Sequence, residues 1–468
     1  MIDPKHSRNP AARIGLLLAI LWAAGCGSDE SSDSGLGLVQ IVNGIVDSPD
    51  LLIEIEEDGD LAETVNALGF QRASRLTSLS RALYEFDIFF EDPEDGFNER
   101  LLSSELEVRR NTVYLGVLSG SFSNPLLTWY ERPEGTVTDA DSEDIELLAI
   151  NLSSESVAVY LGDDSDGLAA ESLVATLAPG SVSSPLLVAH DDDADYRARV
   201  TLDGSDTIVY DSDRITIPVG SRQTLLVTDP TGPDPDTKSL VILSDSSAIA
   251  YGNVAAGSGF RMINALADAA DIRTEVVLSA AGTSVTGQTL LFGEATALIA
   301  ADATFIDVDT FAPAAAATAS TTTVSLSSDT AYVIVTAGTV LEEDVSVRAT
   351  ELDLRSVANS VNIHLINALN ETDDEDISAV DFYALPLGDS LADTAPAATN
   401  VGFLEGRNTL LPATAYDLVV TTAGTQSILA GPARVFPSGG ERVLSVAAES
   451  AGGGLPNQIL TLIDTSGD

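Results

Sequence analysis

Four short apolar segments recur along the chain, and each runs into an asparagine. They cover 39–43, 147–151, 261–266 and 364–369, and their asparagines are Asn43, Asn151, Asn264 and Asn367. The asparagines are separated by 108 (151 − 43), 113 (264 − 151) and 103 (367 − 264) residues. A near-constant period of this length is too long for a solenoid unit and fits a whole small domain. The pattern therefore predicts four tandem copies of one domain.

Inside the copies, apolar and polar residues alternate. Tyr84, Phe86, Ile88 and Phe90 share one face of a predicted strand, whereas Glu85, Asp87 and Glu91 share the other. The same period of two recurs at 196–202 and 416–420, and it is typical of a half-buried strand. Each copy holds about six or seven such short strands, separated by Gly, Pro, Asp and Ser, which predicts an all-β fold of antiparallel β-sandwiches.

Two segments interrupt the strand pattern. The segment 61–68 is compatible with a short helix inside an otherwise strand-like copy. The alanine-rich run 314–319 follows Pro313 and has no apolar stripe to bury, so we expect a loop there.

The repeats resemble the bacterial domain of unknown function numbered 4397, whose copies open with an apolar strand that runs into a polar turn. The segment 43–50 carries this resemblance best, 264–268 and 367–370 carry it less well, and 151–155 carries it weakly. The resemblance implies Ig-like sandwiches and a cell-surface setting, and it implies no reaction and no functional residues. On this reading the tandem Ig-like domains are 38–140, 141–256, 257–357 and 358–468.

The N-terminal segment has the order of a secretory signal. Lys5, His6, Arg8 and Arg13 precede an unbroken apolar run at 14–22, which small residues connect to Cys26. The run is too short to cross a bilayer as a permanent helix, which takes about 20 residues.

The end of this signal, Ala23-Ala24-Gly25-Cys26, resembles the lipobox of bacterial lipoproteins. The resemblance implies that Cys26, the chain's single cysteine, is lipidated and that residues 1–25 are removed as a lipoprotein signal peptide. Two or more acyl chains anchor a protein stably, whereas one holds it only marginally. Gly27 resembles an outer-membrane sorting signal, and residues 26–37 form an acidic, flexible tether. The alternative is an ordinary cleaved signal in which Cys26 is incidental.

The charge balance limits the partners. The chain has 22 Lys and Arg against 72 Asp and Glu, a formal charge of −50. Nucleic-acid binding needs Lys and Arg to neutralise phosphates, so that function is excluded. The surface also repels anionic headgroups, so we expect contact with the membrane through the lipid alone. Envelope proteins or glycans are the expected partners, and the acidity also favours solubility.

Few residues are candidates for metal binding or catalysis. His190 precedes three aspartates at 191–193, but one His beside adjacent carboxylates lacks the spaced ligands that a metal needs. His364 lies on an opening strand and is expected to be a strand-face residue. The acidic runs 163–167 and 371–376 are expected to be solvated loops, with weak calcium binding as an alternative.

No catalytic, cofactor-binding or metal-binding residue is therefore predicted. The recurrent Asn is interpreted as a turn-setting residue that bonds its own backbone two residues on. The sequence favours a lipid-anchored envelope protein with a non-enzymatic structural, adhesion or interaction role. A glycan- or calcium-binding surface module is the first alternative, and a hydrolase with an unrecognised site is the second.

Overall fold

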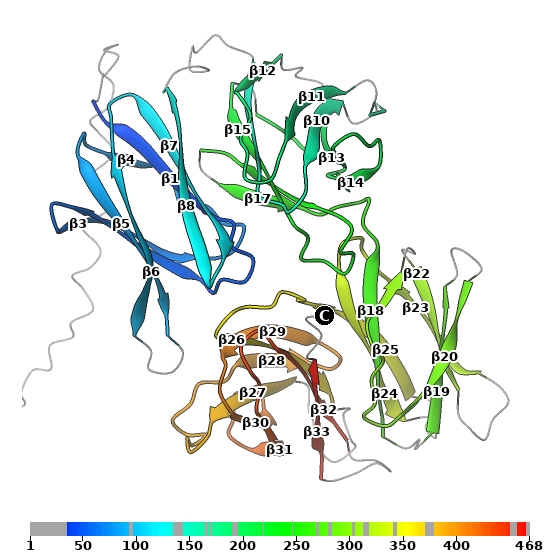
Figure 1. Ribbon diagram of the computed structural model, residues 1–468. Helices are drawn as coiled ribbons and strands as arrows, with labels where there is room; N and C mark the ends of the chain where they lie inside the picture. Colours follow the sequence, from blue (N-terminus) through cyan, green and yellow to red (C-terminus); the bar gives the residue numbers. More distant parts are fainter. Residues whose placement is uncertain are drawn as a thin grey trace, which may run out of the picture. The chain divides into compact units, whose positions relative to one another are not determined.

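The computed structural model describes fifteen stretches of the chain, whose strands are drawn in Figure 1. They are 35–92, 97–133, 144–163, 167–168, 171–189, 195–218, 220–245, 247–267, 271–278, 283–301, 305–311, 318–339, 344–369, 379–449 and 456–464. These residues form 33 strands in eight sheets and no helix, so the predicted all-β fold is confirmed. Within them no helix is long and apolar enough to cross a membrane.

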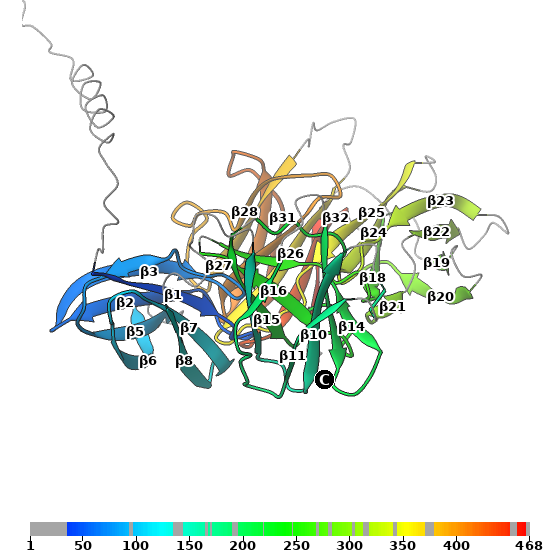
Figure 2. The ribbon, with the colours of Figure 1, turned by 90° about the horizontal axis from the view of Figure 1, so that it is seen from above.

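The sheets fall into four successive pairs, which we call sandwiches 1 to 4. Sandwich 1 covers 37–133 and joins the sheets β4-β1-β7-β8 and β3-β2-β5-β6 (Figure 2). Its strands are β1 Gly37–Asn43, β2 Leu51–Glu57, β3 Asp60–Leu68, β4 Thr77–Leu79, β5 Leu83–Glu91, β6 Asn98–Glu107, β7 Thr112–Ser121 and β8 Asn124–Pro133.

Sandwich 2 covers 145–251 and joins the sheets β12-β9-β15-β16-β17 and β11-β10-β13-β14. Its strands are β9 Ile145–Asn151, β10 Val157–Asp163, β11 Ser172–Leu177, β12 Leu186–Val188, β13 Tyr196–Leu202, β14 Ile208–Asp211, β15 Arg222–Thr228, β16 Ser239–Leu243 and β17 Ala248–Tyr251.

Sandwich 3 covers 258–352, and the strands of its sheets β21-β18-β24-β25 and β20-β19-β22-β23 are labelled in Figure 2. Its strands are β18 Ser258–Leu266, β19 Asp271–Leu278, β20 Thr283–Leu291, β21 Ile299–Ala301, β22 Phe305–Phe311, β23 Thr318–Ser325, β24 Ala331–Thr339 and β25 Asp344–Leu352.

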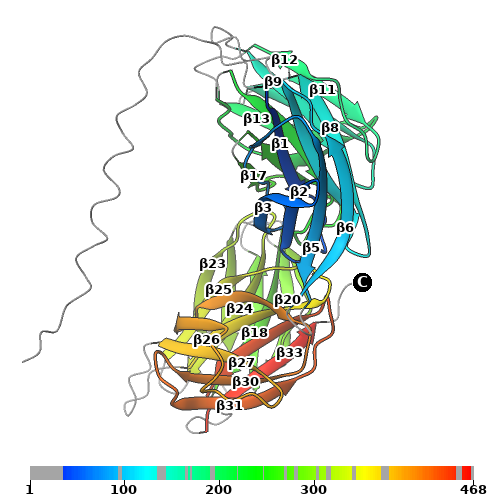
Figure 3. The same ribbon diagram turned by 90° about the vertical axis from the view of Figure 1, so that its left-hand side faces the viewer.

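Sandwich 4 covers 360–464 and joins the sheets β29-β26-β32-β33 and β28-β27-β30-β31, drawn in orange to red in Figure 3. Its strands are β26 Ser360–Ala368, β27 Ala379–Pro386, β28 Ala398–Gly402, β29 Gly406–Pro412, β30 Tyr416–Thr422, β31 Ile428–Val435, β32 Arg442–Ala448 and β33 Gln458–Asp464.

Each sandwich has an apolar core to which both of its sheets contribute. In sandwich 1, Ile41 of β1 and Tyr114 of β7 share a core with Ile53 of β2 and Phe86 of β5. The predicted alternation is visible in β5, where Tyr84, Phe86, Ile88 and Phe90 are buried and Glu85 and Glu91 are exposed. Burial of one face of each sheet against the other is what stabilises a two-layer β fold. Whether each sandwich is an independent domain stays a prediction.

The sheet that holds the opening strand is mixed rather than wholly antiparallel. In each sandwich the opening strand runs parallel to a late strand, in the pairs β1–β7, β9–β15, β18–β24 and β26–β32. The strands between them in sequence lie largely in the other sheet, which supplies the long crossover that a parallel pair needs.

The segment 61–68 is a strand and not a helix. The chain reverses at Asp58 and Gly59, which have φ angles of 52° and 84°, and β3 then pairs antiparallel with β2. Positive φ at both residues of a two-residue loop is the geometry of a tight hairpin, and Asp-Gly favours it. Pairing with β2 overrides a weak local helix preference. The Asp58-Gly59 dipeptide is the signal that would have predicted this strand.

A left-handed backbone position recurs just before each late parallel strand. Asn111, Gly220, Asp329 and Gly440 have φ angles of 55°, 62°, 57° and 83°. Glycine, asparagine and aspartate are the residues that adopt this conformation at least cost. The four residues thus form the same left-handed turn at equivalent positions of the repeat.

Several predictions from sequence fall on residues outside the described part of the chain. These are the signal and Cys26, the tether as far as residue 34, His190 with its three aspartates, the run 371–376, and most of the run 163–167. Of the alanine-rich run, residues 314–317 also lie outside, whereas 318–319 begin β23.

Candidate functional site

The four recurrent asparagines occupy one geometry. Asn43, Asn151, Asn264 and Asn367 are all fully buried at the ends of opening strands. The side-chain oxygen of each accepts the backbone N–H two residues on, at 3.0, 2.9, 2.9 and 3.1 Å. The side-chain nitrogen of each donates to a carbonyl oxygen 25 to 34 residues on, in Leu68, Leu177, Leu290 and Val401.

This geometry confirms that the asparagines set the turn after the opening strand. It adds a second bond, to a chain segment that lies far away in sequence. A buried amide with both ends satisfied stabilises the fold, whereas an unsatisfied one costs about 1–3 kcal/mol. The recurrent Asn is therefore a structural cap whose polar atoms are already used.

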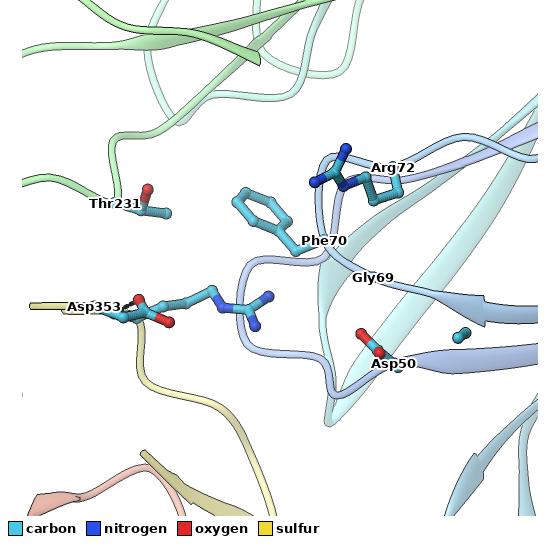
Figure 4. A pocket seen from close by; sticks show the side chains of 8 residues that line it. Asp50, Gly69, Phe70, Arg72, Thr231 and Asp353 are labelled. Carbon is cyan, nitrogen blue, oxygen red and sulfur yellow. Dashed lines mark hydrogen bonds between the residues drawn. The ribbon is translucent and has the colours of Figure 1, made fainter. Parts of the chain in front are cut away.

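A hollow of about 370 Å³ lies beside the first cap. Three parts of the chain line it. They are the start of β2 with the end of β3, the segment after β15, and the segment after β25. Figure 4 labels six of its residues. The lining residues are Asp50, Ala67, Gly69, Phe70, Arg72, Thr231, Asp353 and Arg355.

Charge and one aromatic ring dominate this hollow. The guanidinium carbon of Arg355 lies 5.7 Å from the centre of the Phe70 ring, within the range of a cation–π contact. A Cβ added at Gly69 would lie 2.8 Å from the Asp50 carboxylate, so this glycine makes room for that acid. Two arginines and two aspartates in one place suit a small polar ligand, and the described lining residues include no His, Cys, Ser or Lys.

A second hollow, of about 220 Å³, lies between β8 and the opening sheet of sandwich 2. Its lining is mainly apolar and includes Leu115, Tyr130, Arg132 and Leu148. Burial raises the pKa of Tyr130. Burial, and then the charge of Arg222, lowers the pKa of Arg132. Arg132 Nη1 lies 3.9 Å from Oε1 of the buried Glu146, so this contact is an ion pair at the edge of its range rather than a hydrogen bond.

Three buried charged residues and Arg197 form a network inside sandwich 2. Arg199 contacts both Glu171 and Asp211, and Asp211 also pairs with Arg197. Burial by itself would raise the pKa of Asp211, but hydrogen bonds from Arg197, the Asp213 backbone and Arg199 outweigh it, so the pKa is lowered. The network keeps the Asp211 carboxylate ionised inside the fold, as a buried charge requires.

Lys238, the only lysine after Lys5, is also buried and paired with acidic residues. Its Nζ lies 2.9 Å from Glu155 Oε2 and 3.0 Å from Asp229 Oδ1, and the residue is 3% exposed. Burial lowers its pKa, but the hydrogen bonds to these two acids outweigh burial, so the pKa is raised.

His364 lies on β26, as predicted, and is buried between two sandwiches. Its Nε2 is 2.8 Å from Thr350 Oγ1 and its Nδ1 is 2.8 Å from Asn408 Oδ1. Burial lowers the pKa of His364 to about 4, so the ring is neutral at neutral pH. Both ring nitrogens are occupied, and the ring therefore serves packing rather than proton transfer.

The Asp329 carboxylate has a strongly raised pKa. It lies in the turn before β24, and its Oδ2 accepts the N–H of Asn253, in the segment between sandwiches 2 and 3, at 3.3 Å. Burial raises its pKa to about 6, the bond from Asn253 acts against this, and the charge of Asp234 adds to it.

This carboxylate should make stability depend on pH. The folded chain binds the proton of Asp329 more tightly than the unfolded chain, whose Asp has a pKa near 3.8. The stabilisation is full below about pH 4 and is lost as pH rises through about 6. Asp329→Asn should therefore raise the free energy of unfolding at pH 7, by about 1 kcal/mol after solvent screening. Urea unfolding from pH 4.5 to 7.5 measures the difference from wild type.

Asparagine suits this position, because Asn111 occupies the same left-handed turn in sandwich 1. Asp206→Asn, at an exposed position, is the control for removing one negative charge. Equal shifts in both variants would show that net charge, and not the Asp329 environment, sets the pH dependence.

The described residues contain no group of three or more His, Cys, Asp or Glu side chains placed to hold a metal ion. The acidic runs considered for calcium lie mostly outside these residues, so calcium binding there stays a prediction.

No family model matches this chain, and no curated protein matches it. Among solved structures, the Bacillus anthracis TIE protein is 9% identical, with 85% of this chain and 67% of that chain covered and a TM-score of 0.16. A Streptococcal ancillary pilin is 11% identical, with 63% of this chain and 95% of that chain covered and a TM-score of 0.16. At these scores neither similarity bears on function.

Proposed function

We propose that this is a lipid-anchored, non-enzymatic protein of the bacterial cell envelope, with a structural, adhesion or interaction role. The observation that carries the proposal is the segment Ala23-Ala24-Gly25-Cys26 after a short apolar run. A lipidated Cys26 would tether the sandwiches to a membrane through residues 26–37, and Gly27 favours the outer membrane. The predicted partners are envelope proteins or glycans.

The polar groups buried in the sandwiches support a non-enzymatic role. The four asparagines cap strands, Arg199 bridges Glu171 and Asp211, and His364 is held at both ring nitrogens. Enzymes place their titratable groups in clefts with room for a substrate. These groups instead lie within cores and between sheets, where they stabilise the fold.

Cys26→Ser should abolish lipidation and release the protein from the membrane. The thioether cannot form on serine, and the acidic surface gives no other attraction to anionic lipids. Labelling cells with radioactive palmitate and separating membranes from soluble material tests this. Label and membrane association are expected in wild type and absent in the variant.

Ser28→Ala, two residues after the cysteine, should keep both label and membrane association. Gly27→Asp should keep the label but move the protein to the inner membrane, if the cell has two membranes and this sorting rule operates. A Cys26→Ser protein that still sediments with membranes would exclude the lipid anchor.

A glycan-binding module is a second candidate, favoured by the hollow beside Asn43. Its aromatic ring, paired charges and open shape suit a sugar ligand. Calorimetric titration with neutral oligosaccharides, compared between wild type and Phe70→Ala, tests it. Heat of binding that depends on Phe70 would favour this function over a purely structural one. Titration with millimolar calcium tests the calcium version.

A further inference from the structure

Beyond their four separate cores, the sandwiches are joined by two apolar clusters. In the first, Val42, Leu115 and Val117 of sandwich 1 pack against the opening sheet of sandwich 2. In the second, Ile263, Val333 and Val335 of sandwich 3 pack against the opening sheet of sandwich 4. Among the described residues, no such cluster contains side chains of both sandwich 2 and sandwich 3.

The two clusters share several equivalent positions, whereas Leu148 of the first corresponds to His364 and Leu444 of the second to Thr224. In strand register, Val42 is paired with Val117 just as Ile263 is paired with Val335, and Ile150 with Leu226 just as Ile366 with Val446. Val241 and Leu243 of β16 correspond in the same way to Leu460 and Leu462 of β33. These six shared positions lie 216 (366 − 150) to 221 (263 − 42) residues apart, and every one is apolar.

Polar contacts at the edge of the two clusters recur as well. Arg222 Nη2 lies 2.9 Å from Asp245 in sandwich 2, and Arg442 Nη2 lies 3.2 Å from Asp464 in sandwich 4. Across the first junction Gln40 donates to the Ser244 carbonyl at 2.9 Å. Across the second, Arg261, which stands at the position of Gln40, pairs with Asp464 at 3.3 Å.

Other features alternate between odd and even sandwiches. The left-handed turn residue is Asn111 or Asp329 in sandwiches 1 and 3 but glycine in sandwiches 2 and 4. The hydroxyls of Tyr114 and Tyr332 accept backbone N–H groups five residues before them, in Arg109 and Ser327. Sandwich 1 thus matches sandwich 3 in these details, and sandwich 2 matches sandwich 4.

We propose that the chain is a tandem of two two-sandwich units, 37–251 and 258–464, and that the outer face of the opening sheet in sandwiches 1 and 3 is a docking surface for the following sandwich. A surface that buries aliphatic side chains inside a ring of polar contacts is typical of a lasting interface. Contacts between the two units exist, with Arg355 over the Phe70 ring, the Ala358 N–H donating to the Asp47 carbonyl, and Pro233 close to Gly259, but among the described residues they form no apolar cluster. The repeating unit is therefore about 220 residues long and holds two unlike sandwiches.

Val117→Asp and Val335→Asp form a matched pair of tests, because the two valines occupy equivalent positions and face away from their own cores. The measurement is hydrogen exchange by mass spectrometry on the full chain. Val117→Asp should speed exchange at least about tenfold in β9 and β15 of sandwich 2, where no residue was changed, and leave β26 and β32 unaffected. Val335→Asp should do the reverse. Leu126→Asp, at an exposed site on β8, should change neither.

An effect of Val117→Asp that stays within sandwich 1, or spreads equally to all four sandwiches, would overturn the proposal. Unfolding of sandwich 1 itself by Val117→Asp would be seen as lost protection in β5. In that case the unfolding of the wild-type chain tests the proposal. Its calorimetric unfolding should then show two transitions, one for each unit. A single transition, or four, would contradict a chain made of two units.

Discussion

Arg199→Met should destabilise sandwich 2 by about 3–5 kcal/mol, because it removes the cation that pairs with the buried Glu171 carboxylate, whereas Asp211 keeps its pair with Arg197. Glu171 is 9% exposed and Asp211 is 5% exposed, and both contact Arg199. Methionine fills a similar volume but carries no charge to balance Glu171. Urea unfolding of the full chain, with hydrogen exchange in β13 to locate the change, measures the loss.

Arg197→Met is the matched control. Arg197 pairs with Asp211 only from the solvent side, and Asp211 would keep its bond from Arg199. We therefore expect a loss of about 1 kcal/mol for this variant, as for a partly exposed ion pair. Equal losses for the two variants would mean that the buried position of Arg199 adds nothing.

Asn264→Ala should destabilise sandwich 3 by about 2–5 kcal/mol. The change removes the acceptor for the Leu266 N–H and the donor for the Leu290 carbonyl, both in buried surroundings. Each unsatisfied buried group costs about 1–3 kcal/mol. Thermal unfolding, read together with hydrogen exchange in β18 and β24, tests the expectation.

Asn111→Gly provides the comparison for this cap. Asn111 is exposed and has a left-handed backbone, and glycine already occupies the same turn in sandwiches 2 and 4. A change of a few tenths of a kcal/mol is expected there. If Asn264→Ala were equally mild, the recurrent asparagines would be markers of the repeat and not its caps.

The pattern of neighbouring residues was sufficient to predict most strands and the turn that each recurrent asparagine sets. Alternation in 84–90 places four side chains in the core, because a strand turns successive residues to opposite faces. The bond from Asn43 to the N–H of Ile45 is local and follows from the side chain's reach. Its second bond, to Leu68, joins segments that only the folded chain brings together.

The hollow beside Asn43 could not be predicted from the sequence. Phe70, Arg72 and Arg355 carry no motif and come from segments almost 300 residues apart, so no spacing could relate them. Arg199 and Glu171 likewise look like ordinary surface charges in the sequence. They become a buried pair because the sheet β11-β10-β13-β14 brings β13, which carries Arg199, near the start of β11, which Glu171 precedes.

By itself, the sequence determined that this protein is built from short strands in a recurring order and that the opening strands are unusually apolar, because alternation and hydrophobicity act on neighbouring residues. Only the tertiary structure decided what covers those opening strands on their second face. Val42, Val117 and Ile150 are apolar in the sequence whether they face a core, a neighbouring sandwich or a partner. Which surface excludes water from them depends on contacts between residues that lie far apart in the sequence.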